Sequence, residues 1–271
     1  MLQRPVQRTL FDLACGIYTS ILATVVVALL TSTHYFSPIS LITACLGFLF
    51  GIALAVVRDD LAESLVRTRL YLILSIGPFF VYLISEGVTA FSMGPDSTVL
   101  QNWIAEALLL TIAGFFLYVT TMNYYAVVLR RHEEVLIEWF GRPDTSYLRF
   151  VRLLSIVGGL IFLVSGFILH IPIEPIQGLF PSIGGVLLGN AIVIGKAKHY
   201  TLVKSGLLVK RSGTLNNRFI PRDQLRSVEC DGDVLTLHRG LPWPLPFRCR
   251  LASIPNSDSV VQSLQKYVNE N

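Results

Sequence analysis

The distribution of positive charge among apolar runs constrains this chain more than any other feature. Six apolar runs occupy roughly residues 11–32, 37–57, 70–91, 104–129, 153–170 and 181–197. Most are close to the ~20 residues with which an α-helix crosses a bilayer. When both termini are placed inside, all 22 Lys and Arg residues fall in the inner segments or at the inner ends of the runs. Because Lys and Arg resist translocation, this asymmetry predicts six spans with both termini in the cytoplasm.

The composition agrees with a multi-pass protein. Hydrophobic residues make up 52% of the chain and charged residues 15%, whereas a soluble domain carries about 25% charged residues. We therefore expect the plasma (inner) membrane as the location and membrane lipids as partners. The net charge of +4 is modest, and no nucleic-acid partner is expected.

The residues beyond Lys198 have a different character. Segments 199–213, 216–230 and 233–240 read as short strands separated by Gly, Asn and Asp turn signals. An amphipathic helix is predicted after Ser257, because apolar residues from Val260 to Val268 recur at helical spacing. Three prolines in segment 239–250 cannot all donate hydrogen bonds in a central strand, so an edge strand or an exposed loop is expected there.

An ordered set of short motifs in the second half resembles the bacterial and archaeal PH-like membrane proteins. An acidic lead precedes the last pair of apolar runs and comprises Glu133, Glu134, Leu136, Glu138, Gly141, Arg142 and Pro143. The opening strands of the tail match at Tyr200, Thr201, Leu207, Val209 and Gly213, and the next segment matches at Ile220, Pro221, Leu225 and Val228. The resemblance covers about residues 132–271 and leaves the first four runs unmatched.

This resemblance implies a fold and a role. The resemblance implies a PH-like split β-barrel capped by one α-helix, and together with the six apolar runs it predicts a polytopic α-helical membrane protein with six transmembrane helices and this barrel as a C-terminal cytoplasmic domain. The parts would be a four-helix region (1–131), an acidic lead with a transmembrane hairpin (132–197) and the PH-like domain (198–271). The implied role is a non-enzymatic scaffold or assembly subunit that contacts a protein partner, a second copy of itself or the membrane surface.

Basic and aromatic residues of the tail are the candidate interaction surface, because interface energy concentrates in aromatic and Arg anchors. They are Lys210, Arg211, Arg218, Trp243, Phe247 and Arg248. Charge reversal at Lys210 and Arg211 is expected to weaken a contact without unfolding the protein. For Trp243 and Phe247 a place in a small core is an equally good interpretation.

The alternative function is an ion or small-solute transporter or channel with a pathway through the first four helices. Its polar groups would be Glu86, Glu106 and Asn123, because ionisable groups within spans mark functional sites. The competing interpretation is that both carboxylates reach water at the helix ends and that Asn123 links helices. An enzyme acting on lipid is a weaker third possibility, and its only candidate site is the loop from Arg58 to Arg69.

Small residues predict close helix packing in the last two runs. They are Gly185 with Gly189, and Ser155 with Gly159, and the spacing serves either a tight hairpin or an oligomer contact. The four cysteines and five histidines show no metal-ligand spacing, so neither a metal nor a cofactor is expected. Cys230 and Cys249 are interpreted as small buried residues.

Overall fold

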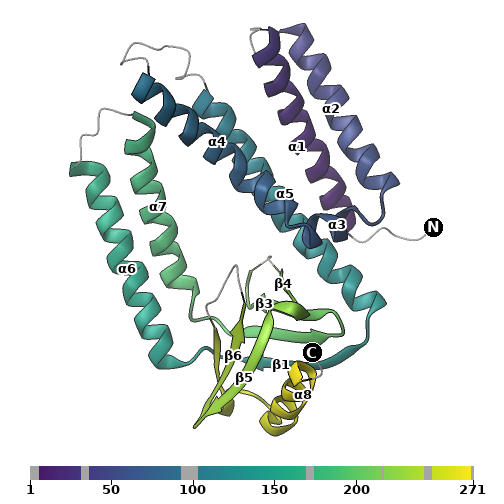
Figure 1. Cartoon of the computed structure of the whole chain (residues 1–271), viewed down its shortest axis with the longest axis vertical. Helices are drawn as coiled ribbons and strands as arrows, with labels where there is room; N and C mark the ends of the chain where they lie inside the picture. The colour runs from purple at the N-terminus through teal and green to yellow at the C-terminus, as the bar shows by residue number, and fades with distance from the viewer. Residues whose placement is uncertain are drawn as a thin grey trace. The chain divides into compact units, whose positions relative to one another are not determined.

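The computed structural model describes residues 6–31, 37–92, 103–168, 174–214, 217–240 and 246–269. Side chains of a few helical residues beside the gaps, including Glu86, are outside this description. The chain forms two compact units, Met1–Leu129 and Arg130–Asn271 (Figure 1). Each unit is described by itself.

The first unit is helical. Its helices are α1 (Val6–Thr31), α2 (Pro38–Val57), α3 (Leu61–Arg67), α4 (Leu70–Ser92) and α5 (Trp103–His132), which ends in the second unit. Each of the first four predicted runs lies within a helix, except for Ser37, which caps α2, and for residue 32, which lies outside the described residues. The short α3 occupies the loop between α2 and α4 and meets α4 at an angle of 66°. Arg69 lies between these two helices with a φ of 58°, a conformation that few non-glycine residues adopt.

Helices α1 and α2 form a tight hairpin. Ser37 caps α2, whose first residue is Pro38, as expected from the fixed φ of proline. The Thr19 hydroxyl donates to the carbonyl of Gly47 at 2.7 Å. A Cβ at Gly47 would lie 2.8 Å from the carbonyl oxygen of Thr19, so only glycine allows the two backbones to come this close.

Aromatic rings connect α1 and α4 to α5. Phe11 of α1 stacks on Tyr124 of α5 with ring centroids 5.4 Å apart, and Tyr71 of α4 stacks on Tyr118 of α5 at 5.1 Å. The opposite faces of the helices are apolar but exposed, as at Leu46, Leu49 and Phe50 of α2. A surface of this kind is typical of helices in contact with lipid.

The second unit combines a helical hairpin with two sheets. Its elements are β1 (Val135–Gly141), α6 (Thr145–Ile168), α7 (Glu174–Val193), β2 (Lys198–Val203), β3 (Gly206–Arg211), β4 (Asn217–Pro221), β5 (Leu225–Asp231), β6 (Val234–Arg239), β7 (Phe247–Arg250) and α8 (Ser257–Asn269), with short 3-10 turns before β5 and after β7. In Figure 1, α6 and α7 run side by side and extend away from the sheets.

Four helices in the described residues are long and apolar enough to cross a membrane. They contain Val6–Ala28, Pro38–Val57, Glu106–His132 and Thr145–Gly166. The bent pair of α3 and α4 would add a fifth span, and the apolar part of α7 is the shorter Phe180–Val193. The structure therefore supports a membrane protein.

The strands form two antiparallel sheets, of order β1-β2-β3-β4 and β5-β6-β7. Within the described strands the sheets do not close into one hydrogen-bonded barrel. They are joined at one corner, where the chain beyond β1 pairs with β7. There the amide of Arg250 donates to the carbonyl of Arg142 at 3.1 Å, and the amide of Asp144 donates to that of Arg248 at 3.2 Å.

The acidic lead forms β1. From the sequence, this segment was grouped with the helical hairpin that follows it and not with the sheet. Glu138 pairs with Thr201 and Gly141 with Lys198, so β1 is the neighbour of β2. The hairpin of α6 and α7 is thus an insertion between two adjacent strands of one sheet. The β-structure of this unit begins at Val135 rather than at residue 198.

One apolar core lies between the sheets and α8. Its centre includes Trp139, Leu202, Leu207, Leu237 and Leu264. The helix predicted after Ser257 is α8, and it buries Val260, Leu264 and Tyr267, as its spacing indicates. The three predicted strand segments contain β2 to β6, and the proline-rich stretch ends in β7, an edge strand.

Candidate functional site

The predicted interaction residues do not share one surface. Side chains alternate between the two faces of a sheet along each strand, so the neighbours Lys210 and Arg211 of β3 point in opposite directions. Lys210 is exposed and Arg211 is half-buried. Arg248 is exposed on β7, whereas Phe247 is buried in the core. Trp243 lies outside the described residues.

Four cations occupy the inner-face positions at one end of the two sheets. In β2, Lys198 comes two residues before Tyr200, and Tyr200 comes two residues before Leu202. Lys198 therefore lies on the same face of the strand as these two core residues. The same alternation places Arg211 beyond Val209 in β3. It also places Arg218 before Ile220 in β4 and Arg239 beyond Leu237 in β6. We call Lys198, Arg211, Arg218 and Arg239 the basic mouth.

A single aromatic ring brings the two sheets together at this mouth. The ammonium of Lys198 lies 5.1 Å from the ring centroid of Phe247, and the guanidinium of Arg239 lies 4.1 Å from it. Lys198 comes from the first sheet and Arg239 from the second. Each such cation–π contact contributes on the order of 0.5–1 kcal/mol, or more when desolvated. Phe247 therefore forms the floor on which cations from both sheets gather.

The pKa values of the mouth report a concentrated positive charge. Burial lowers the pKa of Lys198 to about 8; Cys249 opposes this, and the other three mouth residues lower it further. Burial also lowers the pKa of Arg239 to about 10, followed by the charge of Arg218. Both directions have the same meaning, because a cation is destabilised by desolvation and by like charges. The charged forms of Lys198 and Arg239 are thus disfavoured chiefly by burial and further by their basic neighbours.

A buried polar pair lies beside the Phe247 ring, with the Tyr200 and Phe247 centroids 6.0 Å apart. The thiol of Cys249 donates to the hydroxyl of Tyr200 at 3.1 Å, and both side chains are buried. Burial raises the pKa of both groups. Both groups are therefore neutral at physiological pH.

The outer face of the first sheet carries a separate row of side chains. Phe140, His199 and Lys210 are cross-strand neighbours on β1, β2 and β3. The ring of Phe140 is 59% exposed and stacks on His199 with centroids 4.4 Å apart. We call these three residues the outer row.

A polar network borders the outer row. The buried hydroxyl of Thr201 donates to the Glu138 carboxylate at 2.9 Å and accepts from the Arg130 guanidinium at 2.9 Å. His199 lies 3.7 Å from the same carboxylate. Burial lowers the pKa of His199, and Glu138 opposes this shift.

The polar residues predicted within the membrane helices do not form one site. Glu106 of α5 is buried, and its Oε2 accepts no hydrogen bond from the described residues. Asn123 lies 17 residues beyond Glu106 on the same helix. At a rise of 1.5 Å per residue, these two residues are about 25 Å apart. Glu86 is in α4, and its side chain lies outside the described part of the structure.

The glycines of the last hairpin fall into two groups, one packed between the helices and one facing open space. A Cβ at Gly184 would lie 2.8 Å from the carbonyl oxygen of Gly159, so these two glycines form the contact between α6 and α7. Ser155 is buried on the same helix as Gly159. A Cβ at Gly185 or Gly189 would meet nothing within 4 Å. These two glycines therefore leave a shallow face of α7 uncovered.

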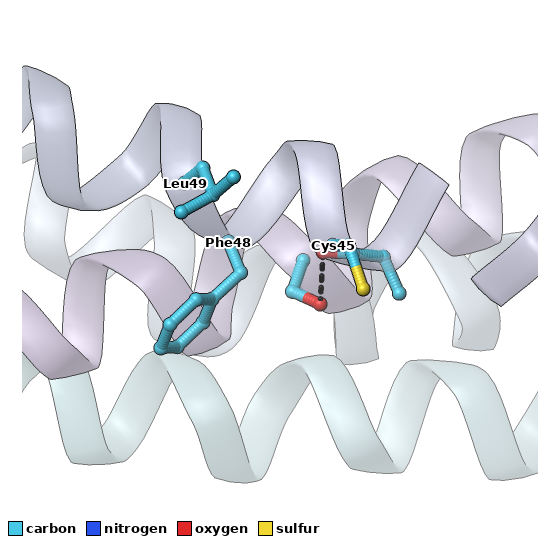
Figure 2. A pocket seen from close by; sticks show the side chains of 5 residues that line it. Cys45, Phe48 and Leu49 are labelled. Carbon is cyan, nitrogen blue, oxygen red and sulfur yellow. Dashed lines mark hydrogen bonds between the residues drawn. The ribbon is translucent and has the colours of Figure 1, made fainter. Parts of the chain in front are cut away.

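Figure 2 shows a groove in the first unit, on α1 and α2. Ser20, Ala44, Cys45, Phe48 and Leu49 line it, and the Ser20 hydroxyl donates to the carbonyl of Ala44 at 2.9 Å. Its volume is about 400 Å³. The Ser20 hydroxyl is already hydrogen-bonded within the hairpin, so the groove would offer an acyl chain mainly apolar contacts.

Other reactive groups are dispersed. In the described parts of the chain, no three His, Cys, Asp or Glu residues are grouped closely enough to hold a metal ion. In the loop considered for lipid chemistry, Asp59 pairs with Arg8 and Glu63 pairs with Arg67. Cys249 is buried as expected, but the expectation for Cys230 was wrong, because it is exposed near the end of the edge strand β5.

Two mouth residues, Lys198 and Arg239, were not among the predicted site residues. The alternation of apolar residues in β2 and β6 carried the necessary signal, because it places both on the same face as the core. Comparisons with protein-family models, with curated proteins and with solved structures gave no significant match.

Proposed function

We propose that this chain is a non-enzymatic integral membrane scaffold, or assembly subunit, whose β-structured unit recruits a protein partner at the cytoplasmic face. One observation carries the proposal: β1 and β2 are adjacent strands that continue into the apolar helices α6 and α7. Three residues connect β1 to α6 and four connect α7 to β2. Such short connections would hold the sheets at the membrane surface.

Six spans with both termini inside agree with the charge distribution. Apolar side chains on α6 such as Phe150, Leu153 and Ile161 are more than half exposed, as lipid-facing residues are. The mouth, at the end of the sheets where the hairpin begins, contributes to the inner positive charge. The two sheets with the single helix α8 support a PH-like fold, which the acidic lead and opening strands also favour.

The outer row is the proposed partner surface. Phe140 supplies an exposed aromatic anchor, and Lys210 supplies a charge beside it. Aromatic and basic groups are enriched where interface energy concentrates. The cations in and beside this row suit a partner that presents carboxylates.

Affinity purification of the full chain in mild detergent, followed by mass analysis, tests this proposal. A variant carrying Phe140→Ala and Lys210→Glu is expected to lose a stoichiometric partner that the wild type retains. Lys266→Glu, an exposed charge reversal on α8, is the matched control. Retention of all partners by the outer-row variant would overturn the scaffold proposal.

A transporter is the second candidate, favoured by the buried Glu106 carboxylate. A carboxylate within an apolar helix is costly and marks ion pathways in many membrane proteins. Glu106→Gln should then abolish ion flux in proteoliposomes. Flux that is absent from the wild type, or unchanged in the variant, would remove this candidate.

A further inference from the structure

We propose that Lys198 is a site of reversible modification by carbon dioxide, at which the ε-amine becomes a carbamate held by the guanidinium of Arg211. This modification is independent of the proposed scaffold function and of the outer row. It uses two residues of the basic mouth and assigns no ligand to the other two.

Burial distinguishes Lys198 from the other lysines. Of the five lysines in the chain, Lys198 alone is half-buried, and its ammonium lies 5.1 Å from the ring centroid of Phe247. The other four are exposed, namely Lys196, Lys204, Lys210 and Lys266. Carbon dioxide is small and uncharged, so it can reach an amine that is only partly open to solvent.

The neighbours of Lys198 disfavour its charged form. Arg211 is its cross-strand partner, and side chains that are paired in this way start about 4.5–5.5 Å apart. Among the described residues, no carboxylate forms a salt bridge with Lys198 or with Arg211. Desolvation and a like charge both shift a lysine toward the neutral amine.

The proton affinity of the amine agrees with this geometry. Burial lowers the pKa of Lys198 to about 8; Cys249 opposes the shift, and the charge of Arg211 adds to it. At pH 7.5 the neutral amine is therefore about a hundredfold or more as abundant as in a lysine with the ordinary value of 10.5. The nucleophilic form of the side chain is thus present under physiological conditions.

The chemistry requires only this neutral amine and carbon dioxide. The lone pair of Nζ attacks the carbon atom, the N–C bond forms, and one C–O π pair moves onto oxygen. The nitrogen then releases a proton to the solvent. Carbamate formation and protonation compete for the same lone pair, so a lysine that holds its proton weakly retains the carbamate better.

Arg211 is placed to hold the product. A carbamate is planar and presents two oxygens, as a carboxylate does, and a guanidinium can donate to both. The modification converts the positive charge of Lys198 into a negative one, so a repulsive cross-strand pair becomes an attractive pair. Lys198 follows the end of α7, at Val193, by five residues. The charge at the junction of hairpin and sheet would then follow the concentration of carbon dioxide.

Chemical trapping on the detergent-solubilised full chain tests the proposal. The protein is equilibrated at pH 7.5 with isotopically labelled bicarbonate and carbon dioxide, and triethyloxonium converts any carbamate into a stable ethyl ester for peptide mass analysis. We expect the labelled ester on Lys198 at an occupancy at least about tenfold above that on any exposed lysine. Equal trapping on Lys198 and the exposed lysines, or none on Lys198, would overturn the proposal.

Variants on β3 test the role of Arg211. Arg211→Gln should reduce trapping on Lys198 about threefold or more, and Arg211→Lys, which keeps the charge but not the forked donors, serves if Arg211→Gln does not fold. Lys210→Gln is the matched control, because its side chain points to the opposite face of the same strand. Equal loss of trapping with Arg211→Gln and Lys210→Gln would overturn the assignment.

Thermal unfolding gives a second readout without trapping. Replacing chloride by bicarbonate at equal ionic strength should raise the melting temperature of the wild type, because the carbamate pairs with Arg211. Lys198→Arg keeps a positive charge but has no amine that forms a carbamate, so it should show no rise. An equal rise in both proteins would identify bicarbonate as a bound ion and would overturn the proposal.

Discussion

Trp139 and Tyr200 stack face to face, with ring centroids 5.1 Å apart and planes inclined by 8°. The whole hairpin of α6 and α7 lies between them in the sequence. Their contact shows that the segment before the hairpin and the segment after it are parts of one folded body. The basic mouth lies at the end of that body where the hairpin is inserted.

The stability of the second unit should rise with pH between about 8 and 10.5. The pKa of Lys198 is about 8 in the folded protein, against its ordinary value of 10.5 in the unfolded chain. Below pH 8 the lysine is charged in both states, and the folded state bears the full cost of burying that charge. Between the two pKa values the unfolded chain binds more protons, so the free energy of unfolding increases with pH.

This pH dependence is measured by thermal unfolding in phosphate-free buffer. Lys198→Met removes the titrating group and should show a smaller increase between pH 8 and 10. Equal pH dependence in the two proteins would show that Lys198 does not titrate in this range.

Charge reversals at the adjacent β3 residues Lys210 and Arg211 should change different properties of the protein. Lys210→Glu changes the exposed outer row and should weaken partner capture while the free energy of unfolding stays within about 0.5 kcal/mol, because side chains alternate faces along a strand. Arg211→Glu places a carboxylate opposite Lys198, its cross-strand partner. It should therefore raise the melting temperature, by relieving like-charge repulsion, and leave partner capture unchanged. Equal effects of both variants on both assays would contradict this division.

Alanine substitutions at the adjacent glycines Gly184 and Gly185 of α7 should differ in their effect on stability. Gly184→Ala directs a methyl group toward the Gly159 carbonyl, 2.8 Å away, and should separate α6 from α7. Overpacking of this kind typically costs about 1–3 kcal/mol. Gly185→Ala adds the same methyl group where nothing lies within 4 Å, and it should leave thermal stability within about 0.5 kcal/mol.

Thermal unfolding of the two alanine variants checks this prediction. If Gly185→Ala is as damaging as Gly184→Ala, then the uncovered face of α7 has a partner, and native mass spectrometry would reveal a second copy of the chain.

Cysteine labelling tests the orientation. Cys230 is exposed and Cys249 is 3% exposed, and burial raises the pKa of the Cys249 thiol. A membrane-impermeant maleimide should therefore label a variant that keeps only Cys230, but only after the cells are opened, because the expected topology places this thiol in the cytoplasm. A variant that keeps only Cys249 should stay unlabelled until it is denatured. Labelling of Cys230 in intact cells would overturn the expected topology.

Local patterns predicted most elements of this fold. Apolar length indicated the helices, and turn residues around segment 199–213 indicated β2 and β3. The amphipathic spacing of Val260, Leu264 and Tyr267 indicated α8. These features depend on neighbours in the sequence, so they can be read without knowledge of the tertiary structure.

Long-range pairing explains what was missed. The pairing of Glu138 with Thr201 across the hairpin left no local signal, so β1 was separated from its sheet. The opposite directions of Lys210 and Arg211 were readable from the alternation of a strand. The meeting of Lys198 with Arg239 was not, because it depends on how two sheets pack against each other.

The insertion of the hairpin has a consequence for synthesis. The ribosome releases β1 first, and β2 follows only after α6 and α7 have been made. The first sheet cannot pair β1 with β2 until both helices have left the ribosome. If the hairpin inserts into the membrane, insertion would bring the ends of the two strands together and shorten the loop that must be closed. The sheet would then be completed only after this part of the chain has been inserted.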